Sequence, residues 1–150
     1  MPWDVNQRRR LAHEVAALRA YFPDFRFHDP TGDTYVAGHW YSNTESYYQF
    51  HVQVPPGYPN ECPHTYITYP TPLRDYRGRR TLDSYGTSHA MHLWRTDRPG
   101  WTKICTYRPE FWSADHSLVK VIRKALLWTV AYECHLQDGR PLQSFLLDFN

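Results

Sequence analysis

The sequence predicts an α+β fold, in which helices flank one antiparallel sheet, and three observations support it. A helical repeat of apolar residues lies near each end of the 150-residue chain. Between them, short strand-like segments are separated by turns, and consecutive strands joined by short turns pair antiparallel. We find no internal repeat, low-complexity segment or linker, so we expect one domain over residues 1–150.

The first helix is expected over residues 4–22. Asp4 and Gln7 have the spacing of a capping box at its start, and Pro23 ends it. One face carries apolar residues at helical spacing, namely Leu11, Val15, Leu18 and Phe22. The basic residues of this helix are expected to lie mostly in solvent.

Four strands are expected next, over residues 25–28, 34–41, 47–54 and 65–69. The third is the clearest, because apolar and polar residues alternate along it. We expect the apolar side of that strand to face the main helix; it consists of Tyr48, Phe50, Val52 and Val54.

The second half of the chain contains an irregular segment and the main helix. Residues 70–100 lack periodicity and are rich in Pro and Gly, which is typical of a functional or mobile loop. The main helix is expected over residues 113–135, with Ser113 as its N-cap. A turn at residues 137–141 and a short apolar tail at residues 142–150 follow.

Composition excludes several classes of protein. The formal net charge of +2 is too small to indicate nucleic acid as the main partner. No apolar run reaches the length of a membrane span, so we expect no membrane partner, and the N-terminus does not resemble a signal peptide. Three cysteines without framework spacing indicate a reducing, cytoplasmic location.

Two motifs carry a resemblance to a known family. A Pro-ended strand runs into a Tyr-Pro bend, VPPGYPNECPHTYI over residues 54–67, and Ile104-Cys105 precedes Trp112-Ser113 by eight residues. In this order they resemble the core of a ubiquitin-conjugating enzyme over residues 4–132. The resemblance implies a thioester on Cys105, accepted from an activating enzyme that supplies a ubiquitin-like protein, and its transfer to a target lysine. It implies no cofactor, and a cis bond between Tyr58 and Pro59.

The chain also departs from the family. The His-Pro-Asn triplet upstream of the cysteine is absent, residues 70–100 form a longer segment than usual, and the two usual C-terminal helices are expected to be reduced or missing. This pattern is similar to shortened members from bacterial ubiquitin-like conjugation operons, some of which serve antiviral defence against phage. The alternative is a catalytically inactive, RWD-like protein-binding module. The absent Asn favours the module, whereas the pairing of Ile104-Cys105 with Trp112-Ser113 favours the enzyme.

Cys105 is the candidate nucleophile, because a thiol both attacks an acyl group and leaves readily. Cys62 and Cys134 are expected to be packing residues. In place of the absent Asn, His92 or His89 is expected to hold the active loop or to donate a hydrogen bond to the oxyanion. Ser88 and Trp94 are the other candidates in that segment, and a loop histidine bonded only to backbone is the alternative.

Further roles follow from the resemblance. Asp138 is the candidate for an acidic residue that orients the incoming lysine, although an ordinary turn Asp has the same signature. Arg8, Arg9 and Arg10 are expected to form a basic docking face for the activating enzyme. Trp112 is expected to be structural. Zinc is disfavoured because no Cys-x-x-Cys pair occurs, and a Cys–His hydrolase lacks a visible third orienting group.

Overall fold

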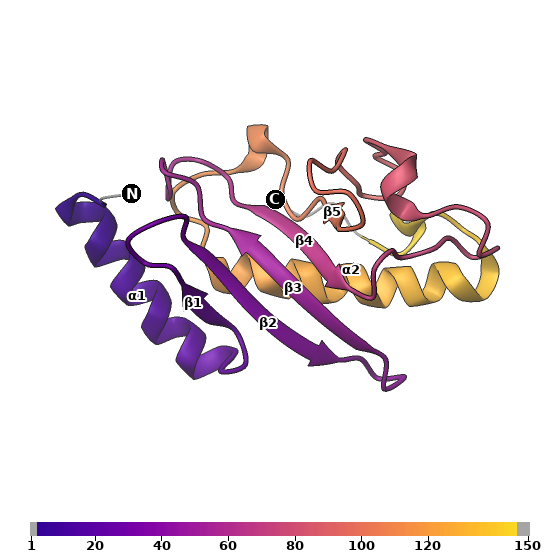
Figure 1. The fold of residues 1–150 in the computed structure, drawn as a ribbon, viewed down its shortest axis with the longest axis horizontal. Helices are drawn as coiled ribbons and strands as arrows, with labels where there is room; N and C mark the ends of the chain where they lie inside the picture. The colour runs from indigo at the N-terminus through magenta and orange to yellow at the C-terminus, as the bar shows by residue number, and fades with distance from the viewer. Residues whose placement is uncertain (1–2, 147–150) are drawn as a thin grey trace.

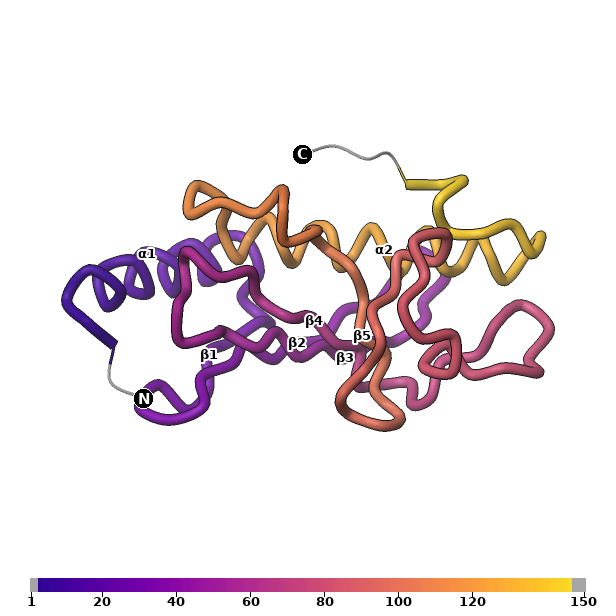
Figure 2. Tube along the Cα trace, turned by 90° about the horizontal axis from the view of Figure 1, so that it is seen from above, coloured from indigo at the N-terminus to yellow at the C-terminus, as the bar shows by residue number. Residues whose placement is uncertain are grey.

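A computed structural model describes residues 3–146, in which both helices lie on one side of a single sheet (Figures 1 and 2). The helices are α1 (Val5–Tyr21) and α2 (Leu118–Asp138). The strands are β1 (Arg26–His28), β2 (Tyr35–Tyr41), β3 (Tyr47–Gln53), β4 (His64–Tyr69) and β5 (Thr102–Ile104). The α+β prediction is therefore confirmed. Within residues 3–146, no helix has the length and apolarity needed to cross a membrane.

The sheet has five strands in the order β1-β2-β3-β4-β5, and each strand is antiparallel to its neighbours. The four predicted strands are present, within one residue at each end. The fifth was not predicted, because three residues are too short to show an alternating pattern. It pairs with β4 through Thr65 and Ile104, and it ends immediately before Cys105.

The side of β3 that faces α2 is the one predicted from its alternation. Tyr48, Phe50 and Val52 are buried in the core. The Tyr48 hydroxyl donates a 2.7 Å hydrogen bond to Glu133 of α2, and the indole N–H of Trp40 on β2 donates to Thr129. The core therefore lies between the sheet and α2, while no helix of the described residues covers the other face (Figure 2).

The start of α1 is the predicted capping box. The Asp4 carboxylate accepts from the Gln7 backbone N–H at 2.8 Å, and the Gln7 side chain accepts from the Asp4 N–H at 3.0 Å. The Gln7 amide also donates to the carbonyl oxygens of Pro56 and Tyr58, so the cap joins α1 to the bend that follows β3. The Tyr58–Pro59 bond in this bend is cis, as the resemblance implied.

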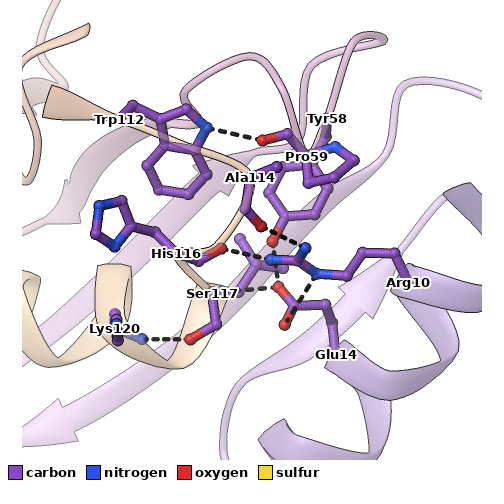
Figure 3. A network of polar contacts seen from close by, with 10 residues as sticks. Arg10, Glu14, Tyr58, Pro59, Trp112, Ala114, His116, Ser117 and Lys120 are labelled. Carbon is purple, nitrogen blue, oxygen red and sulfur yellow. Dashed lines mark hydrogen bonds and ion pairs between the residues drawn. The ribbon is translucent and has the colours of Figure 1, made fainter. Parts of the chain in front are cut away.

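The predicted start of the main helix is wrong. The N-cap of α2 is Ser117, whose hydroxyl accepts from the Lys120 N–H at 3.2 Å, and Ser113 lies in the preceding loop. Figure 3 shows the reason: residues of α1 hold this loop. The Glu14 carboxylate accepts from the Leu118 N–H at 2.8 Å and from the Tyr58 hydroxyl. These contacts come from a segment far away in the sequence, so local capping signals could not reveal the start.

The ends of α2 and of the chain also differ from expectation. The helix continues to Asp138, three residues beyond the predicted end, and Gly139 closes it in the left-handed region at φ 79°. A short 3-10 turn, Leu142–Ser144, lies in the predicted apolar tail. Residues 147–150 of that tail lie outside the described part of the chain.

Candidate active site

Cys105, directly after β5, lines a cavity of about 420 Å³. The other side chains that line it come from two segments, the loop before β5 and the loop after it. The first segment contributes His89 and His92, and the second contributes Arg108 and Glu110. The structure thus brings together the predicted nucleophile and both predicted histidines. Ser88 and Trp94, the other predicted donors, also line the cavity.

The backbone of Cys105 is fixed by a tight hairpin over residues 88–93. Ser88 and Leu93 exchange backbone hydrogen bonds of 3.0 and 2.9 Å, and His92 adopts the left-handed region at φ 50°. The His92 carbonyl accepts from the Cys105 N–H at 2.8 Å and from the indole N–H of Trp128 at 3.0 Å. Because Trp128 is buried in α2, the main helix holds the hairpin and, through it, the thiol.

Basic side chains cluster in the cavity. The imidazole rings of His89 and His92 have centroids 5.4 Å apart. The Arg108 guanidinium lies against His89, with Nη2 2.6 and 2.7 Å from the two ring nitrogens. Arg108 is a lining residue that sequence reasoning missed. Its position three residues after Cys105 was visible, but no sequence pattern showed that its side chain turns toward the same cavity.

Trp112 fixes the loop that follows Cys105. Its indole N–H donates to the Pro59 carbonyl at 2.8 Å, which joins this loop to the Tyr-Pro bend (Figure 3). Its ring packs edge-on against Tyr107, with centroids 5.3 Å apart. The two motifs that carry the family resemblance are therefore in direct contact, and the geometry of Trp112 agrees with its expected structural role.

The other two cysteines lie outside the lining of this cavity. Cys62 is half-buried before β4, and its Sγ lies 3.4 Å from the Pro63 carbonyl. Burial, with a smaller contribution from the charge of nearby Cys105, raises the pKa of the Cys62 thiol to about 12. Cys62 is consequently protonated at neutral pH and is a poor nucleophile there. Cys134 is half-buried on α2.

The predicted acidic residue is not among those that line the cavity. Asp138 ends α2, where its carboxylate accepts from the Arg140 side chain at 2.8 and 2.9 Å. Hydrogen bonds from the backbone and then the side chain of Arg140 lower the pKa of Asp138. The acidic side chain that does line the cavity is Glu110.

The three arginines predicted to dock a partner do not share one environment. Arg8 and Arg9 are exposed. Arg10 turns toward the loop before α2, where its guanidinium donates to the carbonyl of Ala114 at 2.5 Å and to that of His116 (Figure 3). A docking role for Arg8 and Arg9 stays a prediction. The Arg10 guanidinium, in contrast, is engaged in hydrogen bonds that hold the loop before α2.

Among residues 3–146, no group of three or more His, Cys, Asp or Glu side chains is arranged to hold a metal ion.

Comparisons of the chain with protein-family models, with curated proteins and with solved structures found no match.

Proposed function

We propose that the chain is a carrier enzyme similar to ubiquitin-conjugating enzymes, which accepts a ubiquitin-like protein as a thioester on Cys105 and passes it to a lysine amine. One observation supports this most strongly: Cys105 directly follows the last strand and lines a cavity together with His89, His92 and Arg108. A thiol with fixed backbone, an open cavity and adjacent donors is what acyl transfer requires.

In the first step, the Cys105 thiolate attacks the carbonyl carbon of a thioester on the activating enzyme. A new carbon–sulfur bond forms, and the bond to the activating enzyme's sulfur breaks. That sulfur leaves as a thiolate and takes up a proton equivalent to the one that Cys105 lost. The exchange is nearly balanced in energy, because one thioester replaces another, so no cofactor is required in this step.

In the second step, a neutral lysine amine attacks the same carbonyl carbon. The carbon–nitrogen bond forms, the carbon–sulfur bond to Cys105 breaks, and the amine proton passes to solvent. Negative charge develops on the carbonyl oxygen, and the guanidinium of Arg108, which lines the same cavity, would stabilise it. Glu110 lines the same cavity and can attract the incoming ammonium group, a role that the sequence assigned to Asp138.

The test uses a chemically activated acyl donor, which removes the need to know the natural modifier. The purified chain is mixed with a peptide thioester that ends in glycine, and intact mass spectrometry measures acyl transfer. We expect one acyl group on the wild type, none on Cys105→Ala, and normal loading on Cys62→Ala and Cys134→Ala. Cys105→Ser should give a more stable oxyester. Full loading of Cys105→Ala would show that Cys105 is not the nucleophile.

A protein-binding module without catalysis is the second candidate, and the open face of the sheet favours it. Tyr41 and Tyr69 on that face are 62% and 49% exposed, and they flank Tyr47 with ring centroids 4.9 and 5.8 Å from it. Exposed tyrosines of this kind are common in protein interfaces. If the folded wild type accepts no acyl group from the peptide thioester, this module becomes the better explanation.

A further inference from the structure

Four arginines are displayed by one tight loop over residues 74–81, which we name the arginine hairpin. Arg74 and Thr81 form an antiparallel bridge, and the Asp75 N–H donates to the Arg80 carbonyl at 2.9 Å. Gly78 makes the turn in the left-handed region, at φ 67°. The hairpin projects beside the C-terminal end of α2, at the right of Figures 1 and 2.

The four arginine side chains are exposed to solvent, and two of them lie against aromatic rings. The four are Arg74, Arg77, Arg79 and Arg80. The Arg80 guanidinium lies 4.0 Å from the centroid of the Tyr85 ring, and Arg77 donates from Nε to the Tyr76 hydroxyl at 2.7 Å. A guanidinium stacked on a ring is held in orientation while the outer edge of its N–H fork stays open to a ligand.

A buried carboxylate shapes the hairpin from inside. Asp75 is only 7% exposed, and it accepts from the Arg79 N–H at 3.2 Å and from the Tyr85 hydroxyl at 3.0 Å. Burial raises the pKa of Asp75, but these hydrogen bonds and those from neighbouring backbone N–H groups outweigh it and lower the pKa overall. The Asp75 charge therefore serves to order the loop, and the arginine charges remain available at its surface.

Two hydrogen bonds join the hairpin to the main helix. The Tyr132 hydroxyl donates to the Arg74 carbonyl at 2.6 Å, and the Tyr76 N–H donates to the His135 ring at 3.2 Å. Beyond the end of α2, the Tyr76 ring packs closely on Gly139, where an added Cβ would lie 2.7 Å from it. Because the loop is attached to a rigid element, little conformational entropy is lost when its arginines bind a ligand.

We propose that the arginine hairpin is a docking site for a short acidic segment of a partner protein. The planar N–H fork of arginine matches the two oxygens of a carboxylate, and four such forks lie within seven residues. A long nucleic acid would need an extended basic track with stacking platforms, and strong overall positive charge. This chain has a formal net charge of only +2, and its basic site is compact. The proposal is independent of the thiol chemistry at Cys105.

The probe is a fluorescein-labelled peptide of ten glutamates, and its affinity is measured by anisotropy at 50 and 150 mM salt. A variant with Arg77→Gln, Arg79→Gln and Arg80→Gln is expected to bind at least tenfold more weakly. The matched control changes three exposed arginines elsewhere, Arg19→Gln, Arg26→Gln and Arg123→Gln, and is expected to lose less than twofold. Both variants lower the net charge by three. An equal loss of peptide affinity in the two variants would therefore show non-specific attraction by the overall charge and would overturn the proposed site.

A second variant distinguishes binding by an ordered arginine loop from non-specific attraction by positive charge. Asp75→Ala makes the chain more positive by one unit, yet we expect weaker peptide binding because the hairpin loses its internal acceptor. Circular dichroism is measured on this variant to check that the rest of the chain is folded. Tighter binding by Asp75→Ala, or no binding of the peptide to the wild type, would overturn the proposal. Tighter binding of a 20-nucleotide oligothymidine, or of phosphatidylserine vesicles, through the same arginines would overturn the choice of a protein partner.

Discussion

Replacing Glu14 tests how strongly α1 controls the start of α2. The side chain is 4% exposed, and one of its oxygens accepts from both the Tyr58 hydroxyl and the Leu118 N–H. Its other oxygen lies 3.9 Å from the Arg10 guanidinium. Glu14→Ala removes the acceptor for two buried donors at once and also removes a negative charge from the N-terminus of a 21-residue helix.

The expected loss of stability follows from those two donors. A buried donor without a partner costs about 1–3 kcal/mol, so Glu14→Ala should lower the free energy of unfolding by about 4 kcal/mol. For a domain of this size that corresponds to a fall in Tm of roughly 8–16 °C. Glu14→Gln keeps an acceptor oxygen and loses only the charge, so its loss should be about 1–2 kcal/mol.

Urea unfolding followed by tryptophan fluorescence measures these values, and Tyr58→Phe completes a double-mutant cycle. Because the phenylalanine variant removes one of the two stranded donors, Glu14→Ala should be less damaging in that background than in the wild type. The reasoning fails if Glu14→Ala loses less than about 1 kcal/mol, because water or another group would then satisfy both donors.

Three further outcomes are expected. Iodoacetamide at pH 8 should modify Cys105 well before Cys62, whose pKa is about 12; equal rates in peptide mapping would contradict the buried position of Cys62. Arg108→Gln should leave the final extent of Cys105 loading intact but slow discharge to free lysine roughly a hundredfold, as for loss of one oxyanion donor, and unchanged single-turnover discharge would exclude that role. The folded pKa of Asp75 is lowered, so its contribution to stability is present above the unfolded pKa of about 4 and is lost as pH falls through the folded pKa. The difference in Tm between wild type and Asp75→Asn should therefore shrink below about pH 4, and a difference that stays constant from pH 6 to pH 2 would contradict the assignment.

Features that depend on neighbouring residues could be predicted from the sequence. The capping box of Asp4 and Gln7 joins residues three apart, and the alternation along β3 fixed which of its sides is buried. Both signals are local, because helix caps and strand periodicity are set within a few residues. The nucleophile candidate and the two histidines of its cavity were also identifiable, since they lie in segments that the resemblance singled out.

Features set by distant residues could not be predicted. Ser113 and Ser117 are both serines with an N-cap side chain, and contacts from Glu14 and Arg10 of α1 favour the start at Ser117. The short β5 exists because β4 offers an edge to pair with. Arg108 was missed for the same reason, because its side chain joins the site through His89, 19 residues earlier. Asp138 has the sequence signature of a site residue but pairs with Arg140 instead.

The order of the strands has a consequence for the path of folding. Since chain order and spatial order coincide, β1 to β4 can assemble one hairpin at a time, with only short loops to close. The contacts of Arg10 and Glu14 with the start of α2 instead join residues 104 to 106 apart. Such distant pairings form late, so we expect α1 to dock after the rate-limiting step and Glu14→Ala to speed unfolding while leaving the folding rate nearly unchanged. In the native protein, α1 should then be the first helix to open, and its amide hydrogens should exchange with solvent before those of α2.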